Sequence, residues 1–384
     1  MKKALIYASV ASMIQQFNME NIYLLLKQGY EVDVACNMES GSTISQEKIA
    51  EMKRILENMK VNIYHIPIPR NVTAFSGIFR SVSITKKIMN ERKYDLVHCH
   101  SPIGSIICRI ANRFCKNYKK TKMIYTAHGF HFYKGAPIKN WLFYYPFEKL
   151  CAHFTDVLIT INKEDYALAK RKLKAGQIKY VPGVGIDFKK FSTCVINRAE
   201  KRKELGVPEN ASLLLSVGEL NKNKNHETVI KALAKLHNPD IYYLIAGKGN
   251  LECYLKELTE SLNLKNNVKL LGYRTDIAEL YKAADIYCHP SFREGLPVAV
   301  IEAMASGQPL ICSDARGCRD LVTEANGLLV SPDDIDGFKN AIEDLISNEA
   351  KRDFFAENNS IKANFYNIDN INKMLESLYS CKGE

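Results

Sequence analysis

The chain has little that would mark a secreted or membrane-spanning protein. Its 11 cysteines are odd in number and irregularly spaced, with no Cys-x-x-Cys pair, so we expect reduced thiols in a cytosolic protein. No apolar stretch approaches the roughly 18–20 residues of a transmembrane helix. Residues 1–10 resemble a secretion signal, but Gln15-Gln16 ends the apolar stretch and no small-residue cleavage site follows. We therefore interpret residues 4–7 as a first buried strand.

The sequence also has few of the usual nucleotide and metal signatures. Residues 246–250 hold only part of a Gly-x-Gly-x-x-Gly fingerprint and no Gly-Lys-Ser/Thr sequence, which indicates an ordinary strand–helix turn. His98 and His100 fall on one side of an expected strand, with Cys99 on the other. Because no second ligand cluster follows at a recognisable spacing, we expect no metal site, and no nucleic-acid module accompanies the basic charge.

A chain of 384 residues is too long for one ordinary core, so two domains are expected. Short apolar runs alternate with segments of helical periodicity, such as residues 13–28, 46–58 and 103–117, and this alternation predicts parallel, doubly wound sheets. Residues 181–187 interrupt the pattern with two glycines and a proline and are interpreted as a linker. The expected organisation is residues 1–185, residues 186–365, and a C-terminal helical stretch, 366–384, that packs back toward the first domain.

Expected strands cover residues 4–7, 32–35, 62–65, 95–99, 123–126, 157–161 and 179–181 in the first domain, and 213–217, 242–246, 268–271, 286–289, 310–312 and 327–330 in the second. Expected helices in the second domain cover 225–237, 250–262, 276–283, 297–306 and 333–347. Ligands of such sheets bind at the carboxyl ends of the strands. Polar motifs should therefore follow strands.

Two glutamates eight positions apart are the most informative motif. Glu294 follows a buried strand and Glu302 lies about two turns into the next expected helix, with Gly295-Leu296-Pro297 as the turn between them. Proline is favoured in the first turn of a helix, and exposed N–H groups at a helix start attract a phosphate. The two carboxylates can thus hold a hydroxyl-rich ligand on both sides of a phosphate, although a solvated pair of glutamates is the simpler alternative.

Two further motifs follow expected strands. Residues 217–226 carry Gly218, which permits close approach of the backbone to a ligand. They also carry Lys222 and Lys224, whose charges can neutralise a diphosphate. A polar loop with a helix N-cap at Asn225 is the simpler interpretation. Residues 126–132 carry His128, which can exchange a hydrogen bond with a sugar hydroxyl or a leaving oxygen. His131 is the weaker candidate of that segment.

Charge is unevenly distributed. Residues 1–190 contain 30 Lys and Arg against 14 Asp and Glu, whereas residues 191–384 contain 23 against 28. Basic residues from Arg109 to Lys122 precede a densely aromatic segment, 141–147. Basic and interfacial aromatic residues together favour a membrane surface with anionic lipid. A solvated basic face beside an aromatic core is the alternative.

The motifs at residues 95–102, 125–132, 134–137, 221–225 and 294–302 together resemble the retaining family 4 glycosyltransferases of the GT-B fold, most closely those of bacterial exopolysaccharide and capsule synthesis. The resemblance runs over nearly the whole chain. It implies an α/β fold of two Rossmann-like doubly wound domains that face a central cleft. It also implies a nucleotide-sugar donor, no cofactor and no metal.

The resemblance further implies roles for individual residues. Glu294 would bind donor-sugar hydroxyls, Lys224 would neutralise the diphosphate, and His128 would contact the donor sugar across the cleft. Glu302 would bind the ribose. The remaining implied donor-binding positions are Gly218, Lys222, Arg293, the backbone of Gly295, Leu296, Pro297 and Val298, and Tyr273 and Arg274 beside the nucleobase, expected to be uracil.

Two positions depart from the family. Glu219 stands where an arginine is common, and we expect it to turn away or to pair with a cation while Arg293 or Lys222 supplies the charge. The loop after the first strand, residues 9–13, has no glycine, whereas the family often has glycines there.

The sequence thus predicts a cytosolic enzyme, peripheral to the inner face of the cell membrane. It would move a sugar, with an N-acetylhexosamine as first guess, from a UDP-sugar to a lipid-diphosphate-linked saccharide. The alternatives are a UDP-sugar 2-epimerase, a soluble-acceptor synthase, or a non-catalytic protein that binds a membrane or polyanion.

Overall fold

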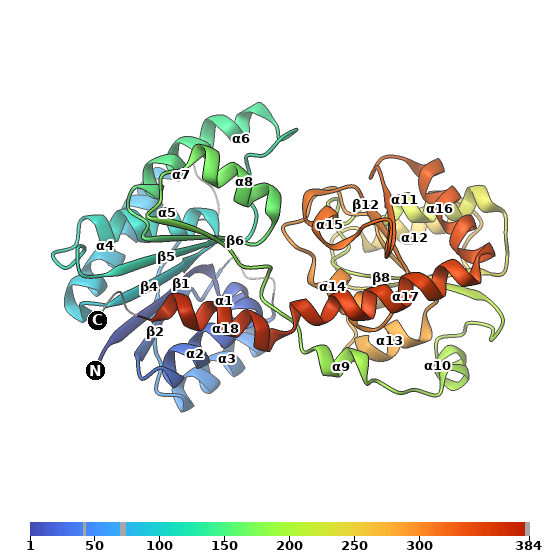
Figure 1. Cartoon of the computed structure of the whole chain (residues 1–384), viewed down its shortest axis with the longest axis horizontal. Helices are drawn as coiled ribbons and strands as arrows, with labels where there is room; N and C mark the ends of the chain where they lie inside the picture. Colours follow the sequence, from blue (N-terminus) through green and yellow to red (C-terminus); the bar gives the residue numbers. More distant parts are fainter. Residues whose placement is uncertain (41–43, 70–73, 381–384) are drawn as a thin grey trace. The chain divides into compact units, whose positions relative to one another are not determined.

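The computed structural model describes residues 1–40, 44–69 and 74–380. These residues form two compact units, which we call unit 1 (1–184 and from Ile371 onward) and unit 2 (Gly185–Asn370). Each unit is an α/β domain with a parallel sheet between helices, so the predicted fold class is confirmed (Figure 1). None of the helices within the described ranges is long and apolar enough to cross a membrane.

In unit 1 the sheet has seven parallel strands in the order β3 (Asn62–His65), β2 (Glu31–Asn37), β1 (Lys3–Val10), β4 (Leu96–His100), β5 (Lys122–Ala127), β6 (Val157–Thr160) and β7 (Gln177–Tyr180). Its helices are α1 (Ala11–Phe17), α2 (Met19–Lys27), α3 (Gln46–Asn58), α4 (Phe75–Arg92), α5 (Pro102–Arg113), α6 (Ile138–Phe143), α7 (Tyr145–Ala152) and α8 (Lys163–Lys172). Chain order reverses between β1 and β4.

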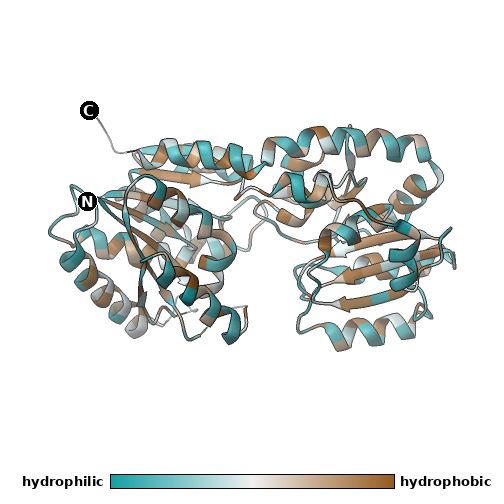
Figure 2. Cartoon of the chain, turned by 90° about the horizontal axis from the view of Figure 1, so that it is seen from below, coloured by the Kyte–Doolittle hydropathy of each residue, from teal (hydrophilic) through white to brown (hydrophobic). Residues whose placement is uncertain are grey.

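Strand alternation divides the core of unit 1 into two layers. Ala4 and Ile6 of β1 face the layer that includes residues of α1, α2 and α3. Leu5 and Tyr7 face the other layer, with residues of α4, α5 and α8. The alternation is what a strand covered on both faces requires. Figure 2 shows the resulting pattern of hydrophobic strands between amphipathic helices.

The C-terminal helix α18 (Ile368–Tyr379) contributes to the first of these layers. Ile371, Leu375 and Tyr379 follow one another at intervals of four residues, so they share one face of the helix. All three are buried. The Tyr30 hydroxyl donates to the carbonyl of Tyr379 at 3.1 Å. Residues 371–379 are therefore part of the unit 1 core.

In unit 2 the sheet has six parallel strands in the order β10 (Val268–Gly272), β9 (Ile241–Ala246), β8 (Ser212–Val217), β11 (Ile286–His289), β12 (Leu310–Ser313) and β13 (Gly327–Val330). Its helices are α9 (Phe188–Ser192), α10 (Arg198–Glu204), α11 (His226–Leu236), α12 (Glu252–Ser261), α13 (Ile277–Ala283), α14 (Val298–Ala305), α15 (Arg316–Leu321), α16 (Ile335–Ser347), α17 (Glu349–Ala363) and the 3-10 turn η1 (Asn364–Tyr366). Apolar residues of α11, α12, α16 and α17 cover one face of the sheet.

Three details of the sequence prediction are wrong. The helix expected at 13–28 is two helices that meet at buried Asn18, whose side-chain amide donates to the Met13 carbonyl at 2.7 Å. The helical C-terminus is interrupted at Asn367. Arg109, assigned to a basic surface, is buried instead, where its guanidinium pairs with Glu148 at 2.8 Å and stacks on the ring of Tyr125.

Candidate active site

In unit 2 the glutamate motif lies where the strand order reverses. β8 and β11 are neighbours in the sheet, and the strands that follow each of them extend in opposite directions. In doubly wound sheets this switch point at the carboxyl ends of the strands is where ligands bind. The loop after β8 carries Lys224, and the loop after β11 carries Glu294.

Consecutive residues tie these two loops together. The Phe292 amide donates to the Asn223 carbonyl at 2.8 Å, and the Asn223 side chain donates to the Arg293 carbonyl at 2.9 Å. The Asn225 side chain donates to the Pro290 carbonyl at 3.1 Å. Asn225 is the residue before α11 but adopts a left-handed conformation and makes no side-chain N-cap bond. Its side chain therefore joins loops instead of capping the helix.

In the loop that these hydrogen bonds hold, the Glu294 carboxylate contacts two polar side chains. Lys224 Nζ lies 2.7 Å from Glu294 Oε1, and His289 Nε2 lies 3.0 Å from the same oxygen. Burial by itself raises the pKa of Glu294, but the Lys224 charge and the His289 hydrogen bond outweigh it and hold the pKa below its ordinary value. Because a carboxylate only accepts, His289 Nε2 carries the proton that it donates. Burial lowers the pKa of His289.

His289 is a site residue that the sequence analysis missed. It is the last residue of the buried strand β11, so its position suggests a core residue. The signal that could have found it is its place at a carboxyl strand end, five positions before Glu294.

Glycines allow the loops of this site to pack closely. A Cβ on Gly247 would lie 1.8 Å from the Gly218 carbonyl oxygen, and one on Gly317 would lie 2.3 Å from that of Gly295. The Arg316 Nε atom donates to the Glu294 carbonyl at 3.1 Å. A Cβ on Gly218, by contrast, would meet the Lys224 stem at 3.4 Å. Gly247 and Gly317, which sequence reasoning did not assign to the site, fix the backbone around Gly218 and Glu294.

Helix α14 begins after Glu294. Pro297 is the residue before its first turn, and buried Leu296 precedes it. The helix starts at Val298, one residue later than expected, and its first N–H groups point out of the helix start, as in any α-helix. No acidic side chain lies in the first turn, so the helix itself carries no charge there that would oppose an anion.

Glu302 lies in the same helix. Its Oε2 atom is 3.3 Å from the Tyr281 hydroxyl, which also donates to the Ala299 carbonyl at 2.8 Å. Burial raises the pKa of Glu302 to about 7, although Tyr281 and the charge of Lys190 oppose the shift. Glu302 is thus a carboxyl group that changes charge near neutral pH.

The other assigned residues of unit 2 lie toward solvent. Lys222, Arg293 and Glu219 are exposed and form no ion pair with any residue in the described part of the chain. Glu219 therefore does not pair with a protein cation, one of the two arrangements expected for it. Tyr273 is exposed, and Arg274 already pairs with Asp276 and Glu204.

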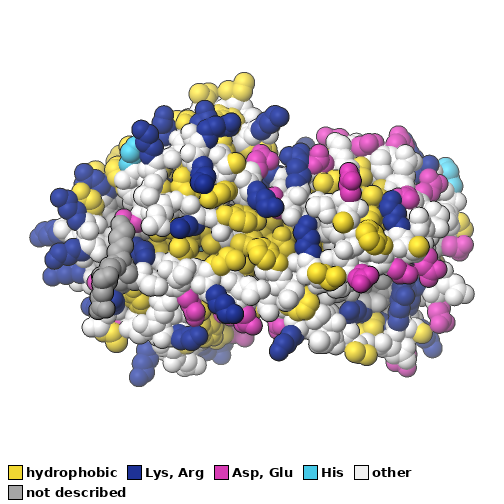
Figure 3. Space-filling view, viewed as in Figure 1, with side chains coloured by type: hydrophobic (Ala, Val, Ile, Leu, Met, Phe, Trp, Pro, Cys, Tyr) yellow, Lys and Arg dark blue, Asp and Glu magenta, His cyan; other side chains and the backbone are white. Residues whose placement is uncertain are grey.

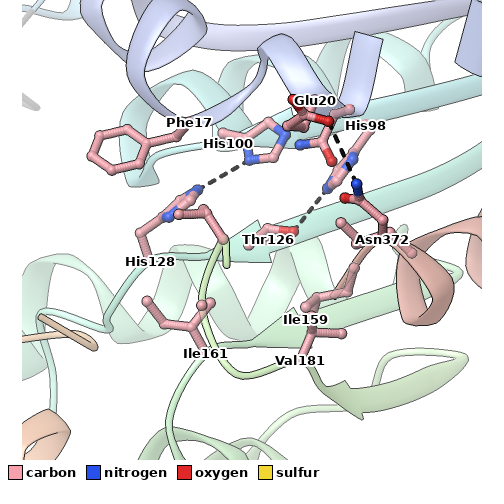
Figure 4. A pocket seen from close by; sticks show the side chains of 14 residues that line it. Phe17, Glu20, His98, His100, Thr126, His128, Ile159, Ile161, Val181 and Asn372 are labelled. Carbon is pink, nitrogen blue, oxygen red and sulfur yellow. Dashed lines mark hydrogen bonds between the residues drawn. The ribbon is translucent and has the colours of Figure 1, made fainter. Parts of the chain in front are cut away.

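Unit 1 holds a cluster of histidines at the ends of β4 and β5, next to the β1–β4 switch point (Figure 4). His100 Nδ1 lies 3.1 Å from His128 Nε2, and the rings of His98 and His100 lie 4.1 Å apart. The expected alternation of His98 and His100 around Cys99 is confirmed. The three histidines line a small cavity with Thr126 and Asn372. His131, the weaker candidate, stacks on Tyr144.

All three clustered histidines are neutral near pH 7. Burial lowers the pKa of His98 to about 3 and that of His128 to about 4, and it lowers the pKa of His100 well below its usual value. Among the described residues, no group of three or more His, Cys, Asp or Glu side chains is arranged to hold a metal ion.

Comparison with known proteins agrees with this geometry. Residues 197–361 match the family model "Glycosyl transferases group 1", and residues 8–162 match "Glycosyl transferase 4-like". The EpsD protein of Bacillus subtilis, named as a glycosyltransferase, is 36% identical over 350 residues, which cover 90% of this chain and 87% of EpsD.

The chain belongs to the glycosyltransferases. A UDP-Gal:alpha-D-GlcNAc-diphosphoundecaprenol alpha-1,3-galactosyltransferase of Escherichia coli is 30% identical over 338 residues, covering 86% of this chain and 83% of the relative. Anabaena HepE, solved with UDP, has a TM-score of 0.77 at 21% identity and covers 99% of this chain and 100% of its own. Sucrose-phosphate synthase of Thermosynechococcus elongatus has a TM-score of 0.79 at 21% identity, with 98% of each chain covered. The protein is a nucleotide-sugar-dependent glycosyltransferase of the GT-B fold.

Proposed function

We propose that this glycosyltransferase moves a sugar from a UDP-sugar to a lipid-diphosphate-linked saccharide, with retention at the anomeric carbon, in exopolysaccharide or capsule synthesis. The observation that carries the proposal is the Lys224–Glu294 pair beside the start of α14. The name of the Escherichia coli relative, which specifies a UDP-sugar donor and a diphosphoundecaprenol-linked acceptor, supports this choice of substrates.

The donor diphosphate is placed at the start of α14. Helix-end N–H groups and a lysine are the usual anion ligands, and Lys224 pairs with Glu294, four residues before the first residue of α14. Lys222 and Arg293, exposed and without ion pairs among the described residues, can add charge as the diphosphate arrives. Glu219, exposed on the same loop, is proposed to turn toward solvent.

The other assigned residues are proposed to bind the remaining parts of the donor, which are the sugar, the ribose and the nucleobase. Glu294, held as a carboxylate by Lys224 and His289, accepts hydrogen bonds from the sugar hydroxyls. Glu302 accepts from the ribose, and the turn at Tyr273 and Arg274 meets the nucleobase. His128 is proposed as a contact to the transferred sugar.

Catalysis then requires that charge on the leaving diphosphate be stabilised. Lys224 and the amides at the start of α14 supply fixed positive ends where that charge develops. The leaving phosphate oxygen takes the proton of the acceptor hydroxyl as the new glycosidic bond forms on the same face. No covalent enzyme nucleophile is required in this scheme.

The acceptor is proposed to come from an anionic membrane surface bound by α6 and α7. Leu142 and Phe143 of α6 are 68% and 53% exposed, and Phe147 and Leu150 of α7 are also exposed. Lys139 and Lys149 lie among them. Figure 3 shows apolar side chains at the top of the view, over the position of α6, with basic side chains nearby. An apolar face with a basic border is the pattern of an interfacial helix.

The test is UDP release from a panel of UDP- and GDP-sugars that includes UDP-N-acetylhexosamines and UDP-galactose, with a polyprenyl-diphosphate-linked N-acetylhexosamine as acceptor. The proposal expects release that depends on both a UDP-sugar and the lipid acceptor, with an α-linked product. Interconversion of UDP-sugars without an acceptor would identify an epimerase and overturn the proposal. Equal transfer to a water-soluble acceptor would overturn the lipid-linked assignment.

A further inference from the structure

Two histidines of the unit 1 cluster, His98 and His100, have no assigned role, and His100 is the one that is hydrogen-bonded to His128. It is buried, with 1% of its surface exposed, and its Nδ1 atom lies 3.1 Å from His128 Nε2. Its other nitrogen, Nε2, is buried without a hydrogen-bond partner. A buried polar atom without a hydrogen bond lowers the stability of the fold, so its presence calls for an explanation.

We propose that His100 is a positioning residue that fixes the tautomer and orientation of His128, and that the C-terminal helix α18 holds His100 in place. The proposal rests on the proposed substrate contact of His128. It assigns to α18 a role in the site beyond its packing in the core.

The first step of the argument is that each imidazole of this cluster is neutral, since burial lowers the pKa of all three. A neutral imidazole has one donor nitrogen and one acceptor nitrogen. In the bond between His100 Nδ1 and His128 Nε2, one ring must therefore donate and the other accept. The tautomer of His100 determines that of His128, and so determines whether His128 Nδ1 donates to a substrate oxygen or accepts from a hydroxyl.

The second step concerns what holds His100. Its ring lies against that of His98, with centroids 4.1 Å apart. His98 is fixed at both nitrogens, by the Tyr379 hydroxyl at 2.8 Å and by the Thr126 hydroxyl at 2.8 Å. Tyr379 belongs to α18 and is fully buried. The C-terminal helix is thus connected to His128 through two imidazoles.

The third step concerns the partnerless nitrogen of His100. The cavity beside it has a volume of about 20 Å³ and is also lined by Asn372 of α18, whose Oδ1 atom is likewise buried without a partner. The Asn372 amide is oriented by its 3.4 Å bond to Glu20. A space of this size holds about one water molecule, and two unpaired polar groups give such a water its ligands. A water that bridges them would satisfy both groups, because it can donate to Asn372 Oδ1 and either donate to or accept from His100 Nε2.

The experiment compares His100→Leu with His100→Asn in the full chain. Leucine fills the space without a hydrogen bond, whereas asparagine keeps a polar atom near the position of Nδ1. Nitrogen NMR of ¹⁵N-histidine-labelled protein reads the protonation of the two His128 nitrogens without substrate, so this reading does not depend on the proposed reaction. We expect a single His128 tautomer in the unmodified protein and in His100→Asn, and two averaging tautomers in His100→Leu.

Turnover gives the second reading. We expect kcat to fall about 10- to 100-fold in His100→Leu, as for a misplaced catalytic contact, with KM for the donor nearly unchanged and with partial recovery in His100→Asn. Tyr379→Phe removes only the bond to His98 and should give a smaller loss in the same direction. Averaging tautomers in the unmodified protein, or full turnover by His100→Leu, would overturn the proposal. If the proposed transferase reaction is wrong, the NMR result still stands, so the two failures can be told apart.

Discussion

Lys224 Nζ and Glu294 Oε1 lie 2.7 Å apart, although the two residues are 70 positions apart in the sequence. Both side chains are largely buried. One backbone bond, from the Phe292 amide to the Asn223 carbonyl, and one bond from the Asn223 side chain to the Arg293 carbonyl fix the distance between their loops. The pair is therefore set by the fold before any ligand binds. It holds the Lys224 cation against a carboxylate that remains ionised, in the segment that precedes α14.

Removal of either partner should affect the reaction much more than the fold. For Lys224→Ala and Glu294→Ala we expect kcat/KM to fall by at least about 100-fold, the usual loss when a charge-stabilising contact is removed. UDP release measures the loss, and circular dichroism checks that each variant is folded. Lys235→Ala is the matched control, since Lys235 forms an exposed ion pair with Asp336 in the same unit. Near-normal turnover in either site variant would contradict the assignment.

The charge of Glu302 should make ribose binding depend on pH. Its pKa of about 7 means that the carboxylate, the better acceptor for two hydroxyls, predominates only above neutral pH. We expect uridine, which has no phosphate to titrate, to bind more tightly as pH rises from 6 to 8, measured by calorimetry. In Glu302→Gln the affinity for uridine should be weaker and independent of pH over this range. An equal pH dependence in both proteins would rule out Glu302 as its source.

Stability should show the opposite trend. Because folding raises the pKa of Glu302 above its ordinary value of 4.5, the folded state binds the proton more tightly, so the contribution of Glu302 is favourable below pH 4.5 and is lost as pH rises through 7. The pKa difference corresponds to at most about 3 kcal/mol. The free energy of unfolding of Glu302→Gln, measured in urea, should therefore rise relative to that of the unmodified protein as pH increases from 5 to 8. A constant difference across this range would contradict the shifted pKa.

The sequence predicted the strands well because each is a short apolar run between polar turns. The alternation of strands and helices predicted that the sheets are parallel. It predicted the Lys224 and Glu294 loops because each follows such a run. It missed His289 and misplaced Arg109, since both are polar residues whose partners, Glu294 and Glu148, come from other elements. Such pairings depend on side-chain packing in three dimensions, which local periodicity does not specify.

Glycine packing at the site gives a second structural test. Gly247→Ala should lower the free energy of unfolding by about 2–4 kcal/mol, because its Cβ would lie 1.8 Å from the Gly218 carbonyl oxygen and a backbone shift must relieve that overlap. Gly218→Ala should change stability by less than about 1 kcal/mol, since its Cβ would meet only the flexible stem of Lys224 at 3.4 Å. Urea unfolding of the two variants checks the contrast. Equal losses of unfolding free energy in the two variants would show that the loops of Gly218 and Gly247 do not pack this closely.

The proposed membrane surface can be tested without substrates. Leu142 and Phe143 are exposed on α6, and burial of such side chains in a bilayer interface stabilises binding by roughly 1.5–3 kcal/mol each. Leu142→Glu with Phe143→Glu should therefore reduce flotation with vesicles that contain anionic phospholipid by at least about tenfold. Val195→Glu is the control, because Val195 is 92% exposed in unit 2, outside α6 and α7. Binding of the unmodified protein should weaken with added salt, since basic residues contribute through screened charge. Equal flotation of the double variant and the control would exclude α6 as the membrane contact.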